Sequence, residues 1–191
     1  MDLSKFKKSD WMKIGGAVGF LIFGFLKWVT VEGPGGVGSG SAGNVFDFFW
    51  TGTLPWILVI ATGVITFLLA NGTMKAGTLP WPLIMLAATG LAALLLLIRI
   101  LFNPVAGSDA VEAFGGSVGR GIGMILSVIS GFVAFAGAFL GFKESGGNFN
   151  DLKDMNKLKG AFQGGATSDS TPPPPPPPPG MTPPPPPPPP A

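Results

Sequence analysis

The chain has 191 residues, of which 47% are hydrophobic and only 12% are charged, and its formal net charge is +2. Soluble domains average about 25% charged residues, so this composition disfavours a soluble all-α protein with buried core helices. The cations flank apolar segments instead of clustering with exposed aromatic residues, which indicates a membrane topology and no nucleic-acid partner. Cysteine, histidine and tyrosine are absent, and we expect no metal, no cofactor and no catalytic residues.

Four apolar stretches are each long enough to carry a helix across a hydrocarbon core about 30 Å thick. They cover residues 11–31, 48–70, 79–102 and 121–142. Because backbone polar groups inside a bilayer must bond to one another, each stretch is expected to be helical. The predicted fold is an all-α membrane protein with a four-transmembrane-helix bundle over residues 11–142.

The first stretch also has the basic start of a signal peptide, followed by an apolar run. That run is longer than the usual apolar region of about 7–15 residues. Trp11 and Trp28 bracket it in the manner of interfacial anchors, so we favour a membrane-spanning helix and keep a cleaved signal peptide as the alternative.

Lysines mark one side of the predicted bundle. They lie in the basic segment 1–10 and at Lys13, in the second loop at Lys75, and after the fourth stretch at Lys143. The first and third loops are poor in cations. By the positive-inside rule both termini are cytoplasmic, and an even number of helices also requires the termini to share a side. We therefore expect a multi-pass protein of the cell membrane, surrounded by the lipid bilayer.

The first outer loop, residues 33–43, is nearly pure glycine and serine, which predicts a flexible segment without a rigid binding site. Tryptophans near the ends of the apolar stretches are interpreted as interfacial anchors. These anchors are Trp11, Trp28, Trp50, Trp56 and Trp81. For the aromatic cluster at residues 45–50 with Trp56, a ligand cage is the alternative.

Small residues recur at every fourth position in several of the stretches, a pattern that lets helix backbones approach closely. The predicted helix-packing positions are Gly15, Gly19, Ala88, Ala92, Gly123, Ser127, Gly131, Gly137 and Gly141. The fourth stretch is expected to be the central packing helix, with a second row at Ser130, Ala134 and Ala138. Packing within one chain is favoured, and packing between chains in a homo-oligomer is the alternative.

Arg99 is the charge most deeply embedded in an apolar run. Such an intramembrane charge is typical of an ion or translocation pathway. We favour a structural role, in which the side chain lies about one turn from the outer boundary and snorkels outward. Pairing with an outer-loop acid would lower its cost; the candidates are Glu32, Asp47, Asp109 and Glu112.

Beyond Phe142 the composition becomes more polar. Residues 143–163 include apolar side chains at spacings of three and four, with lysines and aspartates between them. This pattern predicts a juxtamembrane amphipathic helix that lies on the inner leaflet. A disordered linker with chance periodicity is the alternative.

Residues 164–191 form a low-complexity, disordered tail that contains two pure proline tracts, Pro172 to Pro179 and Pro183 to Pro190. Each tract is expected to form a stiff polyproline II rod about 25 Å long. Preordered rods of this kind bind aromatic grooves at little entropic cost. The tail is therefore the candidate binding site for a cytoplasmic polyproline-binding protein, and a plain spacer is the alternative.

Three motifs support a family resemblance: residues 25–29 at the end of the first stretch, and residues 46–49 and 54–56 after the Gly/Ser-rich loop. In this order they resemble small four-helix membrane proteins common in actinobacteria, some of which have proline-rich cytoplasmic tails. The resemblance covers about residues 11–142. It implies no established activity, cofactor or catalytic residue, and the pure proline tracts depart from the more mixed tails of such proteins.

The sequence thus predicts a non-enzymatic integral membrane protein, an anchor or scaffold that recruits a cytoplasmic partner through its polyproline tail. The alternative is an oligomeric pore-forming, holin-like protein or a transporter-associated subunit. A membrane enzyme comes third, because the apolar stretches contain no acid and Ser127 and Ser130 lack a base.

Overall fold

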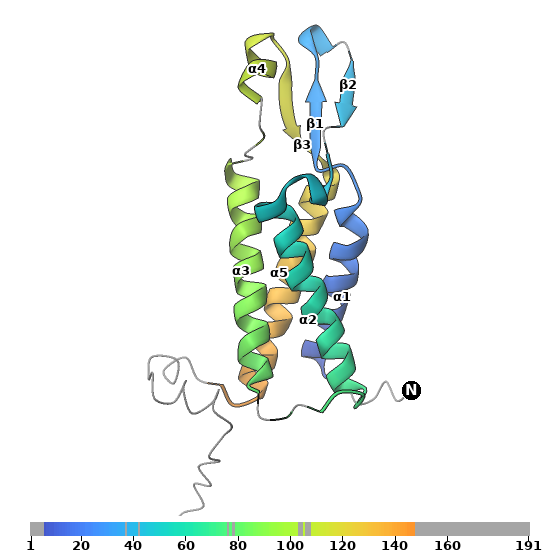
Figure 1. Ribbon diagram of the computed structural model, residues 1–191, viewed down its shortest axis with the longest axis vertical. Coiled ribbons are helices and arrows are strands. Elements are labelled where there is room, and N and C mark those ends of the chain that lie inside the picture. The colour runs from blue at the N-terminus through green and yellow to red at the C-terminus, as the bar shows by residue number, and fades with distance from the viewer. Residues whose placement is uncertain are drawn as a thin grey trace, which may run out of the picture.

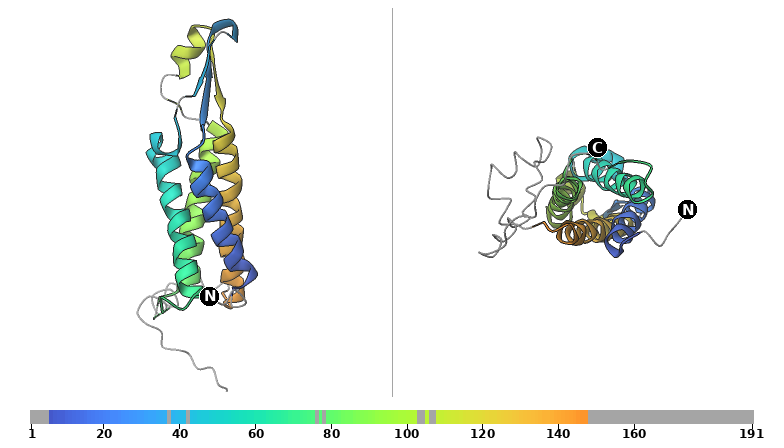
Figure 2. Two further views of the ribbon diagram at one scale, coloured as in Figure 1. Left: turned by 90° about the vertical axis from the view of Figure 1, so that its right-hand side faces the viewer. Right: turned by 90° about the horizontal axis from the view of Figure 1, so that it is seen from below.

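A computed structural model of the chain describes residues 6–36, 38–41, 43–75, 77, 79–102, 105 and 108–147. Its main body is a bundle of four long helices (Figure 1), namely α1 (Lys8–Gly24), α2 (Leu54–Ala70), α3 (Trp81–Phe102) and α5 (Ile122–Glu144). Helix α5 contacts α1 and α3, and α2 contacts the same two helices from the opposite side. The four helices therefore surround one axis, as the end-on view in Figure 2 shows.

The bundle has two distinct ends. At the basal end, α1 begins, α2 is followed by α3, and α5 finishes. At the distal end, the chain forms a small sheet that extends beyond the helices (Figure 1). The predicted amphipathic segment and the polyproline tail lie outside the part of the chain that the structure describes.

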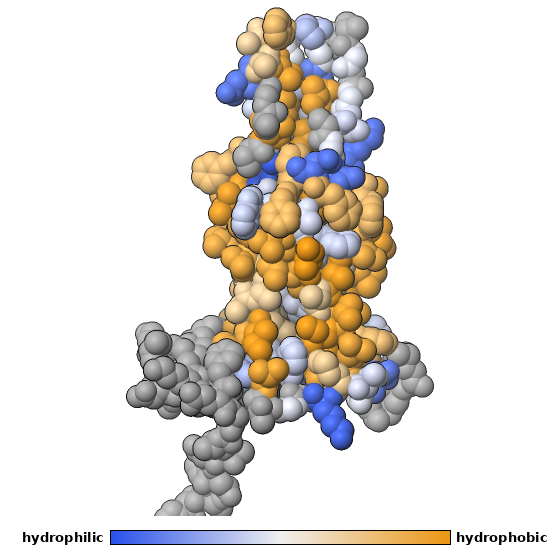
Figure 3. Space-filling model, in the orientation of Figure 1, coloured by the Kyte–Doolittle hydropathy of each residue, from blue (hydrophilic) through white to orange (hydrophobic). Residues whose placement is uncertain are grey.

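Three helical segments are long and apolar enough to cross a membrane: Phe49–Ala70, Trp81–Phe102 and Ile122–Glu144. Their apolar side chains lie largely on the outside of the bundle, as the face drawn in Figure 3 shows. A bundle in water would turn polar residues outward, so this distribution is that of a membrane protein. Pro55 lies in the first turn of α2, where its missing amide proton costs little.

Helix α1 is shorter than the predicted helix over residues 11–31. It ends at Gly24, and Val29–Glu32 form strand β1 instead. The amides of Phe25 and Leu26 close the last turn by bonding the carbonyls three residues earlier. The β-branched residues 29–31 favour extended backbone, and apolarity alone did not distinguish that strand from a continuing helix.

The two distal connections form a sheet together. Strand β1 pairs antiparallel with both β2 (Ser39–Ser41) and β3 (Ser117–Arg120), so the strand order is β2-β1-β3. The turn η2 (Pro34–Gly36) joins β1 to β2, and Gly35 in it has φ of 66°, a conformation that favours glycine. A short helix, α4 (Ser108–Ala113), precedes β3. The Gly/Ser-rich loop therefore has regular structure where we expected a flexible segment, because backbone pairing needs no large side chains.

The segment between the sheet and α2 consists of a 3-10 turn, η3 (Val45–Asp47), and one π-helical turn, η4 (Phe49–Thr53). Asn44 starts η3, and its side-chain oxygen accepts the Phe46 amide at 2.9 Å. In return, the Asp47 carboxylate accepts the Asn44 amide at 2.7 Å. This reciprocal cap fixes how the chain enters the bundle from the sheet.

Candidate functional site

Most predicted packing positions lie against a neighbouring helix. A Cβ atom added to Gly131 would lie 2.6 Å from the Leu96 side chain, and one added to Gly123 would lie 2.7 Å from Leu26. One added to Gly137 would lie 2.8 Å from the backbone nitrogen of Lys13. Ala92 and Ser127 are fully buried, and Gly19 and Gly141 face Ser130 and Lys13.

Gly15 and Ala88 differ from that group. No other side chain or element comes within 4 Å of a Cβ added to Gly15, and Ala88 is partly exposed. The close approach of α1 to α5 occurs at Gly16 instead, where an added Cβ would lie 2.6 Å from the Ala134 nitrogen and 2.7 Å from the Ser130 carbonyl oxygen. Of the two predicted positions in α1, Gly19 therefore faces α5 and Gly15 does not.

The five tryptophans occupy three different environments. Trp11 and Trp50 are 50% and 70% exposed, as side chains in a membrane interface would be. Trp56 and Trp81 are partly buried, and Trp56 contacts the Phe46 ring with a centroid separation of 5.1 Å. Trp28 is fully buried, 6.4 Å from the Phe20 ring between centroids. The anchor interpretation of Trp28 is therefore wrong, because the end of α1 turns this side chain into the core.

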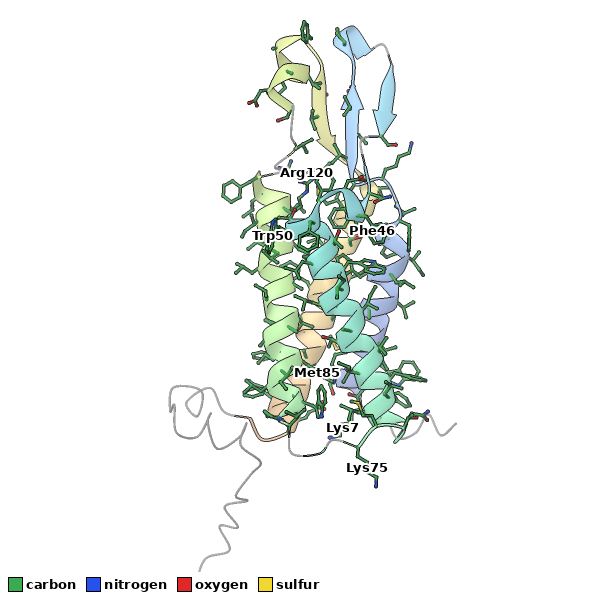
Figure 4. All side chains as sticks on the ribbon, in the orientation of Figure 1. Lys7, Phe46, Trp50, Lys75, Met85 and Arg120 are labelled. Atoms are coloured by element: carbon green, nitrogen blue, oxygen red, sulfur yellow. The ribbon has the colours of Figure 1, made fainter. Side chains whose placement is uncertain are left out.

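Arg99 is enclosed by the bundle. Its side chain has no exposed surface, and its guanidinium carbon lies 3.7 Å from the centroid of the Phe48 ring. This cation-π contact holds the charge inside, where we expected it to snorkel outward. A different arginine, Arg120, caps the C-terminal end of α3; Figure 4 labels it at the distal end of the bundle. Its Nε donates to the Ile100 carbonyl at 2.8 Å, which satisfies a terminal carbonyl of the helix.

The basal end of the bundle contains a cavity of about 320 Å³, here called the basal pocket. All four long helices line it, and two of the lining residues, Lys7 and Met85, are labelled in Figure 4. Its polar lining consists of Lys7, Ser9, Asp10, Lys13, Thr66, Glu144 and Ser145. The remaining lining is apolar, so a polar surface meets the hydrophobic interior of the bundle here.

Three contacts organise the polar residues of the basal pocket. Lys13 Nζ lies 2.9 Å from Asp10 Oδ1, and the two side chains are only 8% and 17% exposed. The other Asp10 oxygen accepts the Lys7 backbone amide at 3.1 Å, which caps the first turn of α1. Ser9 Oγ donates to Glu144 Oε2 at 2.7 Å and so joins α1 to α5.

Sequence reasoning treated Lys13 only as a topology signal. The overlooked indication was its spacing from Asp10, since an acid three residues before a lysine places both on one helix face. The position of Glu144 could not be found in this way, because it depends on how α1 and α5 pack.

A second cavity of about 330 Å³ lies along the outside of α1 and α2 and has a wholly apolar lining. It is here called the seam groove. Ala17 and Gly63 form its floor, since a Cβ added to Gly63 would overlap the Ala17 methyl group. The remaining walls are Ile14, Val18, Leu21, Ile60, Val64 and Phe67.

Within the described residues, no three side chains of His, Cys, Asp or Glu are arranged to hold a metal ion. The predicted partner-binding prolines of residues 172–190 lie outside the described part of the chain. No protein-family model matches the chain, and neither the curated proteins nor the solved structures contain a significant match to it.

Proposed function

We propose that the protein is a non-enzymatic anchor of the cell membrane that presents its polyproline tail to a cytoplasmic partner. In this proposal all four long helices cross the bilayer, and both termini are cytoplasmic. The protein is then of the same type as the small four-helix actinobacterial membrane proteins that it resembles.

The observation that carries the proposal is that α1 begins and α5 ends at the same end of the bundle. That basal end bears Lys7, Lys8 and Lys143, and Lys75 follows α2 there. The distal end carries Glu32 at the end of β1, and Asp109 and Glu112 in α4. This charge distribution agrees with a cytoplasmic basal end, from which the polyproline tail continues.

Helix α1 has 17 residues, a length of about 25 Å. This is at the short end of the range for membrane-spanning helices. Helix α1 packs closely against α5 and α2. Because a helix in a bundle of parallel axes lies at the same depth in the bilayer as its neighbours, this packing supports the proposal that α1 crosses the membrane with them.

Removing the proline tracts should abolish partner binding and leave membrane insertion intact. A photoreactive residue at Thr182, between the two tracts, reports partner contact by crosslinking in cells. The matched control replaces both tracts with Gly/Ser segments of equal length, which keep the spacer but lose the rods. Crosslinks to the same proteins from the Gly/Ser tail would show that the tail is a spacer and would refute recruitment.

The alternative of an oligomeric pore or transporter subunit predicts ion or dye flux from reconstituted protein. In the single chain, Val59, Leu96 and Met124 are fully buried and belong to one core cluster. These packed side chains leave no continuous channel through the interior of the single bundle, so any conducting path would have to lie between chains. We therefore rank the anchor above the pore.

A further inference from the structure

The lining of the basal pocket is exposed on one side and buried on the other. The exposed lining residues lie nearest the basal ends of α1 and α5; they are Lys7, Glu144 and Ser145. Deeper in the bundle, four lining side chains are more than nine-tenths buried, namely Lys13, Thr66, Met85 and Ala138. A small molecule that enters from the basal end therefore reaches a charged side chain inside the bundle.

Lys13 keeps hydrogen-bonding capacity at the buried side of the pocket. Its ammonium group carries three donors, and Asp10 is its only ion-pair partner among the described residues, at 2.9 Å. The side chain is 8% exposed, so water has little access to the remaining donors. Because a buried ammonium group needs acceptors for all its donors, this position favours an anionic group of a ligand.

An acceptor lies close to Lys13, about one helical turn nearer the basal end. Helix α5 has a glycine beside Lys13: a Cβ atom added to Gly141 would lie 3.3 Å from Lys13 Nζ and 3.7 Å from Ser9 Oγ. Ser9 Oγ donates to Glu144 Oε2 at 2.7 Å, and Glu144 Oε1 takes part in no hydrogen bond with the described residues. The missing side chain at Gly141 thus leaves space between a free donor and a free acceptor.

The charges that line the basal pocket are balanced. Two cations and two acids contribute to it, namely Lys7, Lys13, Asp10 and Glu144. A ligand with one charge of each sign keeps that balance, whereas a simple anion or cation would leave a net charge in a partly buried site. Much of the remaining lining is apolar and includes Leu69, Trp81 and Met85. The lining therefore favours a small zwitterion with an apolar side chain.

We propose that the basal pocket binds a free α-amino acid with an apolar side chain. The carboxylate accepts from Lys13, the ammonium group donates to Glu144, and the side chain packs against Leu69 and Met85. The pocket volume of about 320 Å³ lies in the range of small-molecule sites. This site depends on the packing of the four helices, and not on the polyproline tail or its partner.

Competition binding tests the proposal on the purified full-length protein in detergent. Tritiated leucine is displaced by unlabelled leucine, by isocaproate, which lacks the ammonium group, and by isoamylamine, which lacks the carboxylate. We expect leucine to bind at least about tenfold more tightly than either analogue, because each analogue loses one hydrogen bond between charged groups.

Two variants assign the two charged contacts. Lys13→Met should bind leucine and isoamylamine equally, since the carboxylate has lost its partner. Glu144→Gln should bind leucine and isocaproate equally, and because Glu144 is exposed this variant is expected to fold. If Lys13→Met does not fold, Asp10→Asn/Lys13→Met replaces it, because it removes both charges of the buried pair.

The matched controls are Lys8→Met and Glu112→Gln. Both residues are exposed and neither lines the pocket, so both variants should keep the preference of the wild type for leucine. Deletion of Pro172–Ala191 should also leave leucine binding unchanged, which separates this site from the recruitment of a partner.

Equal affinity of the wild-type protein for leucine and its two analogues would overturn the proposal. An unchanged preference for leucine in Glu144→Gln would also overturn it, because the ammonium group would then bind elsewhere. Glycerophosphoethanolamine is a zwitterion without a carboxylate. Displacement of leucine by this compound at equal concentration would overturn the assignment to an amino acid, in favour of a phosphate-containing ligand.

Discussion

Replacing Gly16 with leucine should lower the free energy of unfolding by about 3 kcal/mol, the upper part of the usual range for overpacked cores. The atoms nearest to a Cβ at this position are the Ala134 nitrogen and the Ser130 carbonyl oxygen, at 2.6 and 2.7 Å. Both belong to the α5 backbone, which cannot move aside as a flexible side chain would. The new side chain must therefore separate α1 from α5, the most extensive helix contact in the bundle.

Gly15→Leu is the control for this substitution. Gly15 is the preceding residue in the same helix, and an added Cβ meets no other side chain or element within 4 Å. Its replacement should change stability by less than about 0.5 kcal/mol. Thermal unfolding of both variants in one detergent measures the difference, and equal losses would contradict the described α1–α5 contact.

Replacing Trp28 with alanine should cost about 3–5 kcal/mol, the usual range for truncating a buried aromatic side chain. Trp28 is fully buried and belongs to the same core cluster as Phe20, Leu96 and Met124. Its loss leaves a cavity where β1 and the end of α1 meet the distal end of α5, since the Gly121 amide donates to the Trp28 carbonyl at 2.9 Å.

Trp50→Ala provides the comparison, because the Trp50 side chain is 70% exposed. Figure 4 labels it at the distal end of the bundle. We expect its unfolding free energy to stay within about 0.5 kcal/mol of the wild type in detergent. Chemical unfolding followed by the remaining tryptophan fluorescence measures both variants. A small effect at Trp28, similar to that at Trp50, would restore the interpretation of Trp28 as an interfacial anchor.

The parts of the fold that depend on local sequence could be predicted. The three spans that start near Phe49, Trp81 and Ile122 lie close to their predicted bounds, because length and apolarity determine them. Pro55 marks a helix start for an equally local reason, its missing amide proton.

The distal sheet could not be predicted in this way. Strand β1 pairs with β3, which lies three helices later in the chain, and nothing in residues 29–32 indicates that partner. The Gly/Ser-rich composition of residues 33–43 also concealed β2, because that strand is held by backbone hydrogen bonds and not by side-chain burial.

The basal pocket could be predicted from the sequence only in part. The Asp10–Lys13 pair is visible as a helix spacing, whereas the contact from Ser9 to Glu144 requires the packing of α1 on α5. Small-residue rows leave a similar ambiguity, since Gly15 and Gly16 are adjacent and only the packed helices show which one faces α5.

The central claim is that the bundle is oriented with both chain termini, and hence its basal end, in the cytoplasm. Single-cysteine labelling tests this orientation most directly. The chain has no native cysteine, so one cysteine can replace Ser41 or Asp109 at the distal end, or Lys75 or Ser145 at the basal end; all four residues are exposed. With a membrane-impermeant maleimide on intact cells, the account predicts labelling at Ser41 and Asp109, and labelling at Lys75 and Ser145 only after the membrane is opened. Labelling of Lys75 or Ser145 on intact cells would contradict it.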